Sequence, residues 1–148
     1  MQRSSLRACA LVLAAAASVG ACGSGDADRA RGLAREACAN YEMFLTSDFS
    51  TADARKTAHR RVVPALEDSA RQAAQAARLD SDWQELALGL SRVAQQTSAS
   101  LDLADLQAGT TRSDGPDDEE ELQASVLNLG GEIDAHDPKA QCLKTQDS

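Results

Sequence analysis

Histidines and their neighbouring carboxylates are the side chains in this chain that could bind a metal ion or move a proton. His136 lies between Asp134 and Asp137, a spacing that could hold a metal loosely. A solvated surface cluster is the simpler interpretation of that set. His59 is followed by two arginines, and neither histidine has a second histidine four residues away with a glutamate between, as a zinc-protease helix requires. The spacing therefore assigns no metal ligand.

The acidic residues and serines predict no stronger site. Five consecutive acids run from Asp117 to Glu121, but they lack the alternating ligands and the central glycine of an EF-hand loop. Non-specific attraction of cations is the most that this block indicates. Ser69 and Ser91 lack the GxSxG pattern that is typical of one class of serine hydrolase. The sequence assigns no catalytic residue, no metal and no cofactor.

The N-terminal segment has the layout of a secretory signal peptide. Arg3 and Arg7 are basic, residues 8–19 are mainly apolar, and small residues follow. The apolar run is too short to span a bilayer. At its end, Val19-Gly20-Ala21-Cys22 resembles the lipobox of bacterial lipoproteins.

This resemblance covers only the N-terminal segment, and it implies that Cys22 is lipidated. In that family the cysteine sulfur receives a diacylglyceryl group, and the signal peptide, here residues 1–21, is cut off just before the cysteine. Cys9 does not fit, because Arg7 stands where the pattern needs a small residue. The alternative is an ordinary cleaved signal with a cysteine at the cut by chance.

A lipid anchor would make the membrane the first partner of the mature chain. Two or more acyl chains, such as palmitate, anchor stably because each buried methylene contributes about 0.8 kcal/mol. Residues 22–26 are then expected to form the lipidated cysteine and a flexible tether that contains two glycines. Removal of residues 1–21 takes away two arginines and no acid, so the net charge of −8 becomes −10. We therefore expect an acidic domain, residues 27–148, outside the cell membrane.

The four cysteines support an extracytoplasmic location. If Cys9 is lost with the signal peptide and Cys22 carries lipid, Cys38 and Cys142 remain as an even pair in a compartment where disulfides persist. A bond between them would close a loop of 104 residues, and a loop of that size contributes on the order of 4 to 5 kcal/mol in the chain-entropy model. A redox or metal pair is the competing interpretation, but the chain has no CxxC motif.

Apolar residues at three- and four-residue steps predict a first helix over residues 27–46. Its apolar face comprises Ala30, Leu33, Ala34, Ala37, Cys38, Tyr41, Phe44 and Leu45. Cys38 is thus on the side that should face the core, which favours a structural bond over an exposed sensor thiol.

A second helix should begin near Thr51, with Ser50 as its N-cap and Asp53 in its first turn. Its apolar face consists mostly of small residues: Ala54, Ala58, Val62, Ala65, Leu66, Ser69, Ala73, Ala76 and Ala77. Pro64 interrupts the pattern. Because proline removes a backbone hydrogen bond and crowds the preceding turn, we expect a kink or short break at residues 60–64.

The third predicted helix has the clearest periodicity. Ser81 as N-cap and Gln84 at the third helical position form a capping box at its start. One face then carries Trp83, Leu86, Ala87, Leu90, Val93, Ala94, Thr97, Leu101 and Ala104.

The C-terminal part of the chain predicts an acidic loop and two further helical segments. Residues 113–121 are expected to form a mobile acidic loop, because consecutive like charges repel one another. Leu122, Val126 and Leu129 predict a fourth helix that can hold Glu119 to Glu121 in its first turn and that ends at the glycines 130–131. Asp137 followed by proline predicts one short turn over residues 138–144, which carries Cys142. The expected fold is all-α, a small antiparallel bundle of about four helices with a disulfide-docked C-terminal turn.

Four basic residues would align on the face of the second helix that lies opposite its alanines: Lys56, Arg60, Arg71 and Arg78. We call this set the basic stripe. One interpretation is a solvated helix face that pairs with Glu67 and other acids, since exposed ion pairs contribute only about 0 to 1 kcal/mol. The other is contact with anionic lipid headgroups or an acidic envelope polymer.

Composition argues against nucleic-acid binding, because an acidic chain repels phosphate and only 3% of the residues are aromatic. The whole chain resembles small actinobacterial lipoproteins, which have one cysteine early in the first helix and another near the C-terminus. We expect a membrane-tethered, non-catalytic extracytoplasmic domain that binds a protein partner or an envelope component. The alternatives are an envelope hydrolase and a small-ligand-binding protein, for which a deep pocket with convergent polar groups would be the sign.

Overall fold

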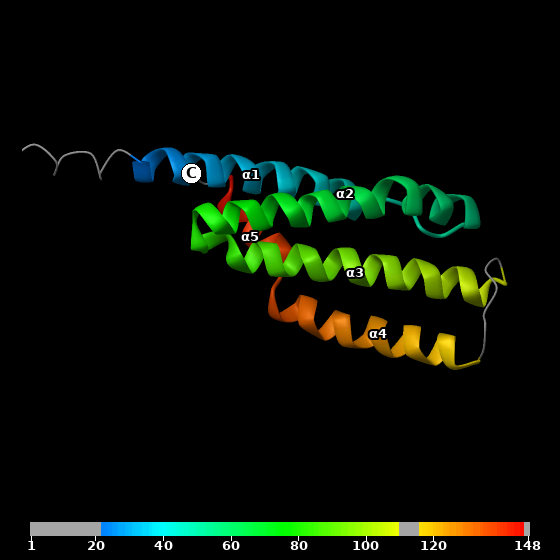
Figure 1. Cartoon of the computed structure of the whole chain (residues 1–148). Helices are drawn as coiled ribbons and strands as arrows, with labels where there is room; N and C mark the ends of the chain where they lie inside the picture. The colour runs from blue at the N-terminus through cyan, green and yellow to red at the C-terminus, as the bar shows by residue number, and fades with distance from the viewer. Residues whose placement is uncertain (1–21, 110–115, 147–148) are drawn as a thin grey trace, which may run out of the picture.

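The computed structural model describes residues 22–109 and 116–146, and within these ranges the chain forms helices joined by short turns, with no strand (Figure 1). The predicted all-α class is therefore confirmed, with five α-helices where about four were expected. They are α1 (Cys22–Leu45), α2 (Ala52–Leu79), α3 (Gln84–Gln107), α4 (Pro116–Ala135) and α5 (Pro138–Lys144), with a 3-10 turn η1 (Ser81–Trp83) before α3. The predicted signal peptide and the first three residues of the lipobox lie outside the described residues.

The four long helices form an antiparallel layer in chain order (Figure 1). The main interfaces join α1 to α2, α2 to α3 and α3 to α4, whereas neither α1 nor α2 forms a comparable interface with α4. The short helix α5 contacts both α1 and α3. The bundle is thus an open layer, and α5 bridges its first and third long helices.

Small residues allow α1 and α2 to approach closely. Ala34 and Ala37 of α1 and Ala73 and Ala76 of α2 are fully buried. Ser69 of α2 is also fully buried, and its hydroxyl donates a 2.8 Å hydrogen bond to the carbonyl oxygen of Ala37. The larger fully buried side chains include Leu66 of α2 and Leu86 and Leu90 of α3.

Two helix starts differ by one residue from their predicted caps. Thr51, and not Ser50, is the N-cap of α2, because its extended backbone lets its hydroxyl accept a hydrogen bond from the N–H of Ala54. Asp80, and not Ser81, caps the next segment, and its carboxylate accepts from the N–H of Asp82. The chain enters α3 through η1, so the predicted capping box at Ser81 does not form.

Of the kink or short break predicted at residues 60–64, the break does not occur, and the predicted end of the fourth helix is wrong. The helix α2 continues through Pro64, which is exposed, while the adjacent Val62 and Val63 are buried in the core. Packing on both sides of α2 compensates for the backbone hydrogen bond that the proline removes. The helix α4 continues past the glycines 130–131 to Ala135, because Ile133 extends its apolar face and packs against the core.

The segments at the two ends of the described chain differ in how well sequence predicted them. The predicted turn over residues 138–144 is confirmed as α5, with Asp137 as its N-cap and Pro138 at its first position. The helix α1 begins at Cys22 and not at residue 27, so the expected tether has a helical backbone. Residues 116–121 of the expected acidic loop are likewise helical and open α4, whereas residues 113–115 lie outside the described residues.

Candidate functional site

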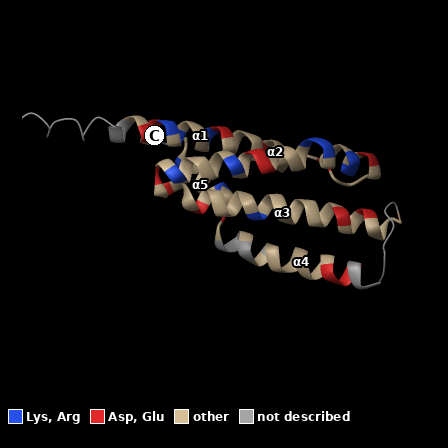
Figure 2. Cartoon of the chain, in the orientation of Figure 1, with Lys and Arg blue, Asp and Glu red and all other residues tan. Residues whose placement is uncertain are grey.

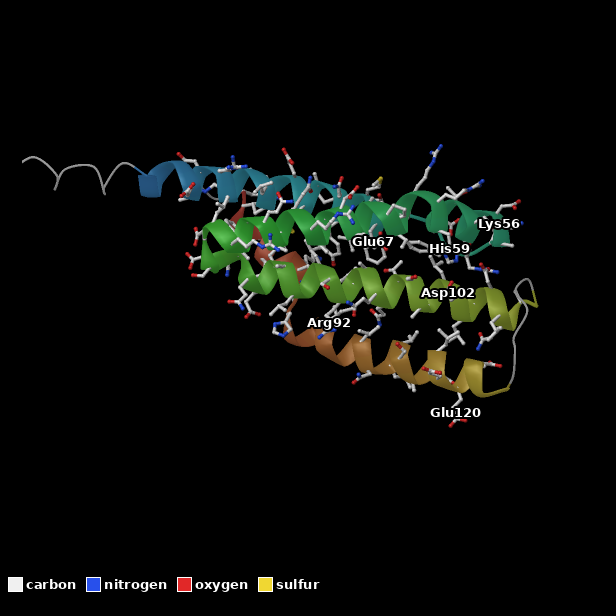
Figure 3. The ribbon with its side chains drawn as sticks, viewed as in Figure 1. Lys56, His59, Glu67, Arg92, Asp102 and Glu120 are labelled. Carbon is white, nitrogen blue, oxygen red and sulfur yellow. A yellow bond between two sulfur atoms is a disulfide. The ribbon has the colours of Figure 1, made fainter. Side chains whose placement is uncertain are left out.

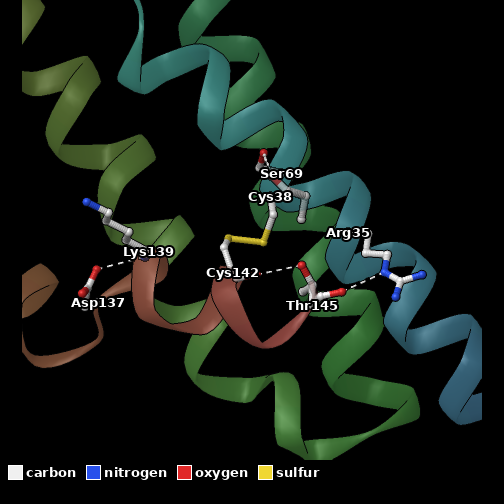
Figure 4. The surroundings of a disulfide bond; sticks show 8 residues. Arg35, Cys38, Ser69, Asp137, Lys139, Cys142 and Thr145 are labelled. Atoms are coloured by element: carbon white, nitrogen blue, oxygen red, sulfur yellow. Dashed lines mark hydrogen bonds between the residues drawn. A yellow bond between two sulfur atoms is a disulfide. The ribbon is translucent and has the colours of Figure 1, made fainter. Parts of the chain in front are cut away.

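Cys38 and Cys142 form a disulfide that joins α1 to α5, with 5.6 Å between their Cα atoms (Figure 4). The bond spans a sequence separation of 104 residues. Cys38 lies on the buried face of α1, as its position in the apolar pattern predicts. The disulfide fixes α5 against the layer of long helices.

Polar contacts add to the docking of α5. Arg35 of α1 donates through Nε to the carbonyl oxygen of Thr145, at 2.9 Å (Figure 4). Thr145 is buried, and its hydroxyl donates to the carbonyl oxygen of Cys142 at 2.8 Å. Burial raises the pKa of the Tyr41 phenol, and the nearby carboxylate of Asp137 raises it further. The C-terminal segment is therefore held by a covalent bond, by hydrogen bonds and by packing.

The basic stripe occupies one exposed face of α2, as predicted, but acids are interspersed with it (Figure 2). Lys56 lies 4.0 Å from Asp53, and Arg71 pairs with Asp68. On a helix with 100° per residue, Glu67 falls within the arc that the four basic residues cover. The stripe is thus a mixed surface whose net charge is less positive than its four basic residues suggest.

A charged cluster joins α2 to α3 where α2 begins and α3 ends. Arg55 donates through Nε to Asp105 Oδ1 at 2.8 Å, and both side chains are mostly buried. His59 Nε2 lies 3.4 Å from Asp105 Oδ2 and 3.8 Å from Asp102 Oδ1, and Figure 3 shows His59 and Asp102 on neighbouring helices. The hydrogen bond from Arg55, followed by its positive charge and that of His59, lowers the pKa of Asp105.

Sequence reasoning missed this cluster. Its signal was present, since Arg55 and His59 are four residues apart on one helix and Asp102 and Asp105 are three apart on another. Only the antiparallel register of α2 against α3 brings the two pairs together, and that register is not readable from either helix alone.

Two hollows lie on opposite sides of α3. The larger, about 740 Å³, runs between α2, α3 and α4, and we call it the outer groove. Small and polar residues dominate its lining, which includes Glu67, Arg71 and Asp102. Arg71 is therefore the member of the basic stripe that borders this groove.

The smaller hollow, about 360 Å³, lies between the end of α1, the start of α2 and the second half of α3, and we call it the aromatic recess. Its lining is Phe44, Phe49, Arg55, Gln96, Thr97, Ser100, Leu101 and Ala104. The rings of Phe44 and Phe49 have centroids 5.9 Å apart, and Tyr41 stacks on Phe44 at 5.8 Å. Three of the four aromatic residues of the chain thus gather at this place.

Of the set around His136 that the sequence offered as a loose metal site or a solvated surface cluster, the side chain of Asp134 lies outside the described residues. His136 Nδ1 lies 2.5 Å from Glu85 Oε2 on α3, and the carboxylate of Asp137 accepts from the N–H of Lys139. Among the described residues, no group of three or more histidine, cysteine or acidic side chains is arranged to hold a metal ion. Within that same part of the chain, no helix is both long and apolar enough to cross a membrane.

Cys22, the residue predicted to carry lipid, is the first residue of α1, and its side chain lies outside the described residues. Comparison with known proteins adds no relative: no family model, no curated protein and no solved structure matches the chain.

Proposed function

We propose that this chain is a lipid-anchored extracytoplasmic domain that binds an envelope component without catalysing a reaction. The observation that carries the proposal is the sequence Val19-Gly20-Ala21-Cys22 at the end of an apolar run, directly before the first helix. A diacylglyceryl group on Cys22 would place the acyl chains at the N-terminus of α1. With no flexible tether between them, the domain would be held at the membrane surface.

The disulfide supports the same location. Bonds of this kind persist in oxidising compartments and are rare where cellular thiols keep cysteines reduced. Here the bond joins the two cysteines that remain when Cys9 and Cys22 are set aside. Its position on a buried helix face favours a structural role over a catalytic one.

The basic stripe is the contact surface that we propose, and its orientation determines what it can reach. Figure 1 shows that α2 ends toward the same end of the layer at which α1 begins, so Arg78, in the last turn of α2, is the member of the stripe nearest the anchored end, whereas Lys56 is 22 residues away, or about 33 Å along the helix. Electrostatic attraction at physiological salt fades over about 8 Å. All four basic residues would therefore meet anionic headgroups or an anionic polymer together only if α2 lies parallel to the membrane.

The anchor is tested by comparing Cys22→Ser with Cys9→Ser in the full chain, expressed in bacteria that process lipoproteins. We expect Cys22→Ser to abolish incorporation of an alkyne-labelled fatty acid and to release the protein from the membrane fraction or leave it unprocessed. Cys9→Ser is the matched control, because that cysteine is expected to leave with the signal peptide. A Cys22→Ser protein that is still labelled and processed would refute the proposal.

A further inference from the structure

The aromatic recess has the composition of a site for an amphiphilic molecule. Aromatic and aliphatic side chains form most of its wall, with Phe44 and Phe49 on one side and Leu101 and Ala104 on the other. Among the described residues that line it, Arg55 is the one charged residue. Its volume is at the lower end of the range for small-molecule sites, about 300 to 1,000 Å³.

The recess exists because α5 covers only part of one side of the layer. The helix α5 bridges α1 and α3 near Gly89, where Pro138 packs. Gly89 and Ser100 are eleven residues apart, which places them on the same side of α3 and about 16 Å from one another. Beyond the reach of α5, the side chains of Phe44 and Phe49 fill this side incompletely, and the recess remains.

Arg55 is placed to receive an anion there. Its bond to Asp105 engages Nε, and a guanidinium carries further N–H donors on its two Nη atoms. Asp102, the other acid of the cluster, lines the outer groove on the opposite side of α3. Partial burial of Arg55 strengthens a charge-assisted hydrogen bond relative to one in water.

We propose that the aromatic recess binds a small amphiphilic anion, with its alkyl chain against Phe44, Phe49 and Leu101 and its carboxylate or phosphate on Arg55. A headgroup on Arg55 adds a charge-assisted hydrogen bond at its Nη atoms beside the existing bond from Nε to Asp105, while the alkyl chain removes apolar surface from water. The proposal is independent of the lipid anchor, since a chain without lipid at Cys22 keeps the recess.

The first test uses the full chain with Cys22→Ser and follows binding by the rise in the thermal unfolding midpoint. The probes are decanoate, decyl phosphate, decanol and decyltrimethylammonium, each below its critical micelle concentration. We expect both anions to bind at least about tenfold more tightly than the alcohol or the cation. Shortening decanoate to octanoate should weaken binding by about fourfold for each methylene removed. Equal binding of the cation and the anions would overturn the proposal.

The two anions separate the headgroup classes. Tighter binding of decanoate would assign a carboxylate ligand, and tighter binding of decyl phosphate would assign a phosphate. Absence of binding by both would refute the site.

Two charge variants distinguish recognition by Arg55 from damage to the fold. Arg55→Gln should weaken the binding of decanoate at least about tenfold, because it removes a charge-assisted hydrogen bond. Asp105→Asn should instead tighten the binding of decanoate several-fold, because this variant lacks the carboxylate that competes for Arg55. Structural disruption of the cluster would weaken binding in both variants, and that result would refute the role of Arg55.

A matched pair of alanine substitutions locates the ligand. Ala104→Leu fills the aromatic recess, whereas Ala99→Leu makes the same change on the outer-groove side of α3. We expect Ala104→Leu to weaken the binding of decanoate at least about tenfold and Ala99→Leu to leave the affinity for decanoate unchanged. Equal affinity in the two variants, both folded by circular dichroism, would place the ligand elsewhere and refute the proposal.

Discussion

Gly89 of α3 lies so close to His136 that a Cβ atom built on the glycine would stand 2.1 Å from the backbone oxygen of the histidine. The same Cβ would lie 2.9 Å from the ring of Pro138. The absence of a side chain at this one position therefore lets the segment between α4 and α5 cross α3. The contact sets how deeply α5 is docked.

We expect Gly89→Ala to destabilise the protein by about 1 to 3 kcal/mol, because backbone must move to admit the methyl group. Gly32→Ala in α1 is the matched control, since nothing lies within 4 Å of the Cβ that it would add. That change should stabilise the protein by about 0.5 to 1 kcal/mol, because alanine favours the helix. Urea unfolding at a single pH measures both. If the two variants changed the free energy of unfolding in the same direction, that result would contradict the close contact between Gly89 and His136.

Loss of the disulfide should release α5 and lower the free energy of unfolding by about 2 to 5 kcal/mol. A helix of seven residues is not stable alone, so its amides should exchange with solvent far faster in Cys38→Ala with Cys142→Ala. Hydrogen exchange of residues 138–144 checks the release, and chemical unfolding checks the energy. Alkylation of both cysteines without prior reduction, in the parent protein, would show that the bond is absent.

The bond between Arg55 and Asp105 predicts a dependence of stability on pH. Because the pKa of Asp105 is lowered in the folded state, its ionised form stabilises the fold above the ordinary pKa of about 3.9. This contribution is lost as the pH falls through the lowered value. The stability difference between the parent and Asp105→Asn should therefore be largest at neutral pH and shrink in acid.

Arg55→Gln should make the parent's loss of stability in acid shallower, since it removes the main cause of the lowered pKa. Urea unfolding at several pH values from neutral to about 2 measures the effect. If the difference in free energy of unfolding between the parent and Asp105→Asn stayed constant across this range, the ion pair with Arg55 would not lower the pKa of the Asp105 carboxylate.

The basic stripe predicts salt-sensitive binding to anionic vesicles. With Cys22→Ser as the background, Arg60→Glu together with Arg71→Glu should weaken binding at least about tenfold, since each basic residue near the surface contributes about 1 kcal/mol. Arg29→Glu together with Arg61→Glu makes the same charge change outside the stripe and should have a smaller effect. Co-sedimentation at two salt concentrations measures both. Equal loss in the two double variants would indicate a response to net charge alone.

Local patterns predicted those features that depend on a few neighbouring residues. Asp137 and Pro138 mark the start of α5 because a cap and a fixed backbone angle act within one turn. The apolar face of α1 placed Cys38 inward for the same reason. By contrast, the end of α4 depends on Ile133 packing against other helices, which outweighs the cost of the glycines before it.

Features that require two elements in register were not predictable from sequence. The cluster of Arg55, His59 and Asp105 requires the antiparallel alignment of α2 and α3. The aromatic recess depends on where α5 stops covering the layer. The stripe was placed correctly as a face of α2 that pairs with acids, but the one acid named from the sequence was Glu67, whereas Asp53 and Asp68 pair with two of its members.

The disulfide has a consequence for the order of assembly. Each main interface joins helices that follow one another in the chain, so the layer can form progressively from its N-terminal end. The covalent bond is the exception, because Cys142 comes after all four long helices. Until α5 has been made, Cys38 has no native partner and stays open to exchange with other thiols. Closure of the bond therefore reports that synthesis has reached α5. A chain that ended before α5 would carry the unpaired thiol of Cys38 on α1.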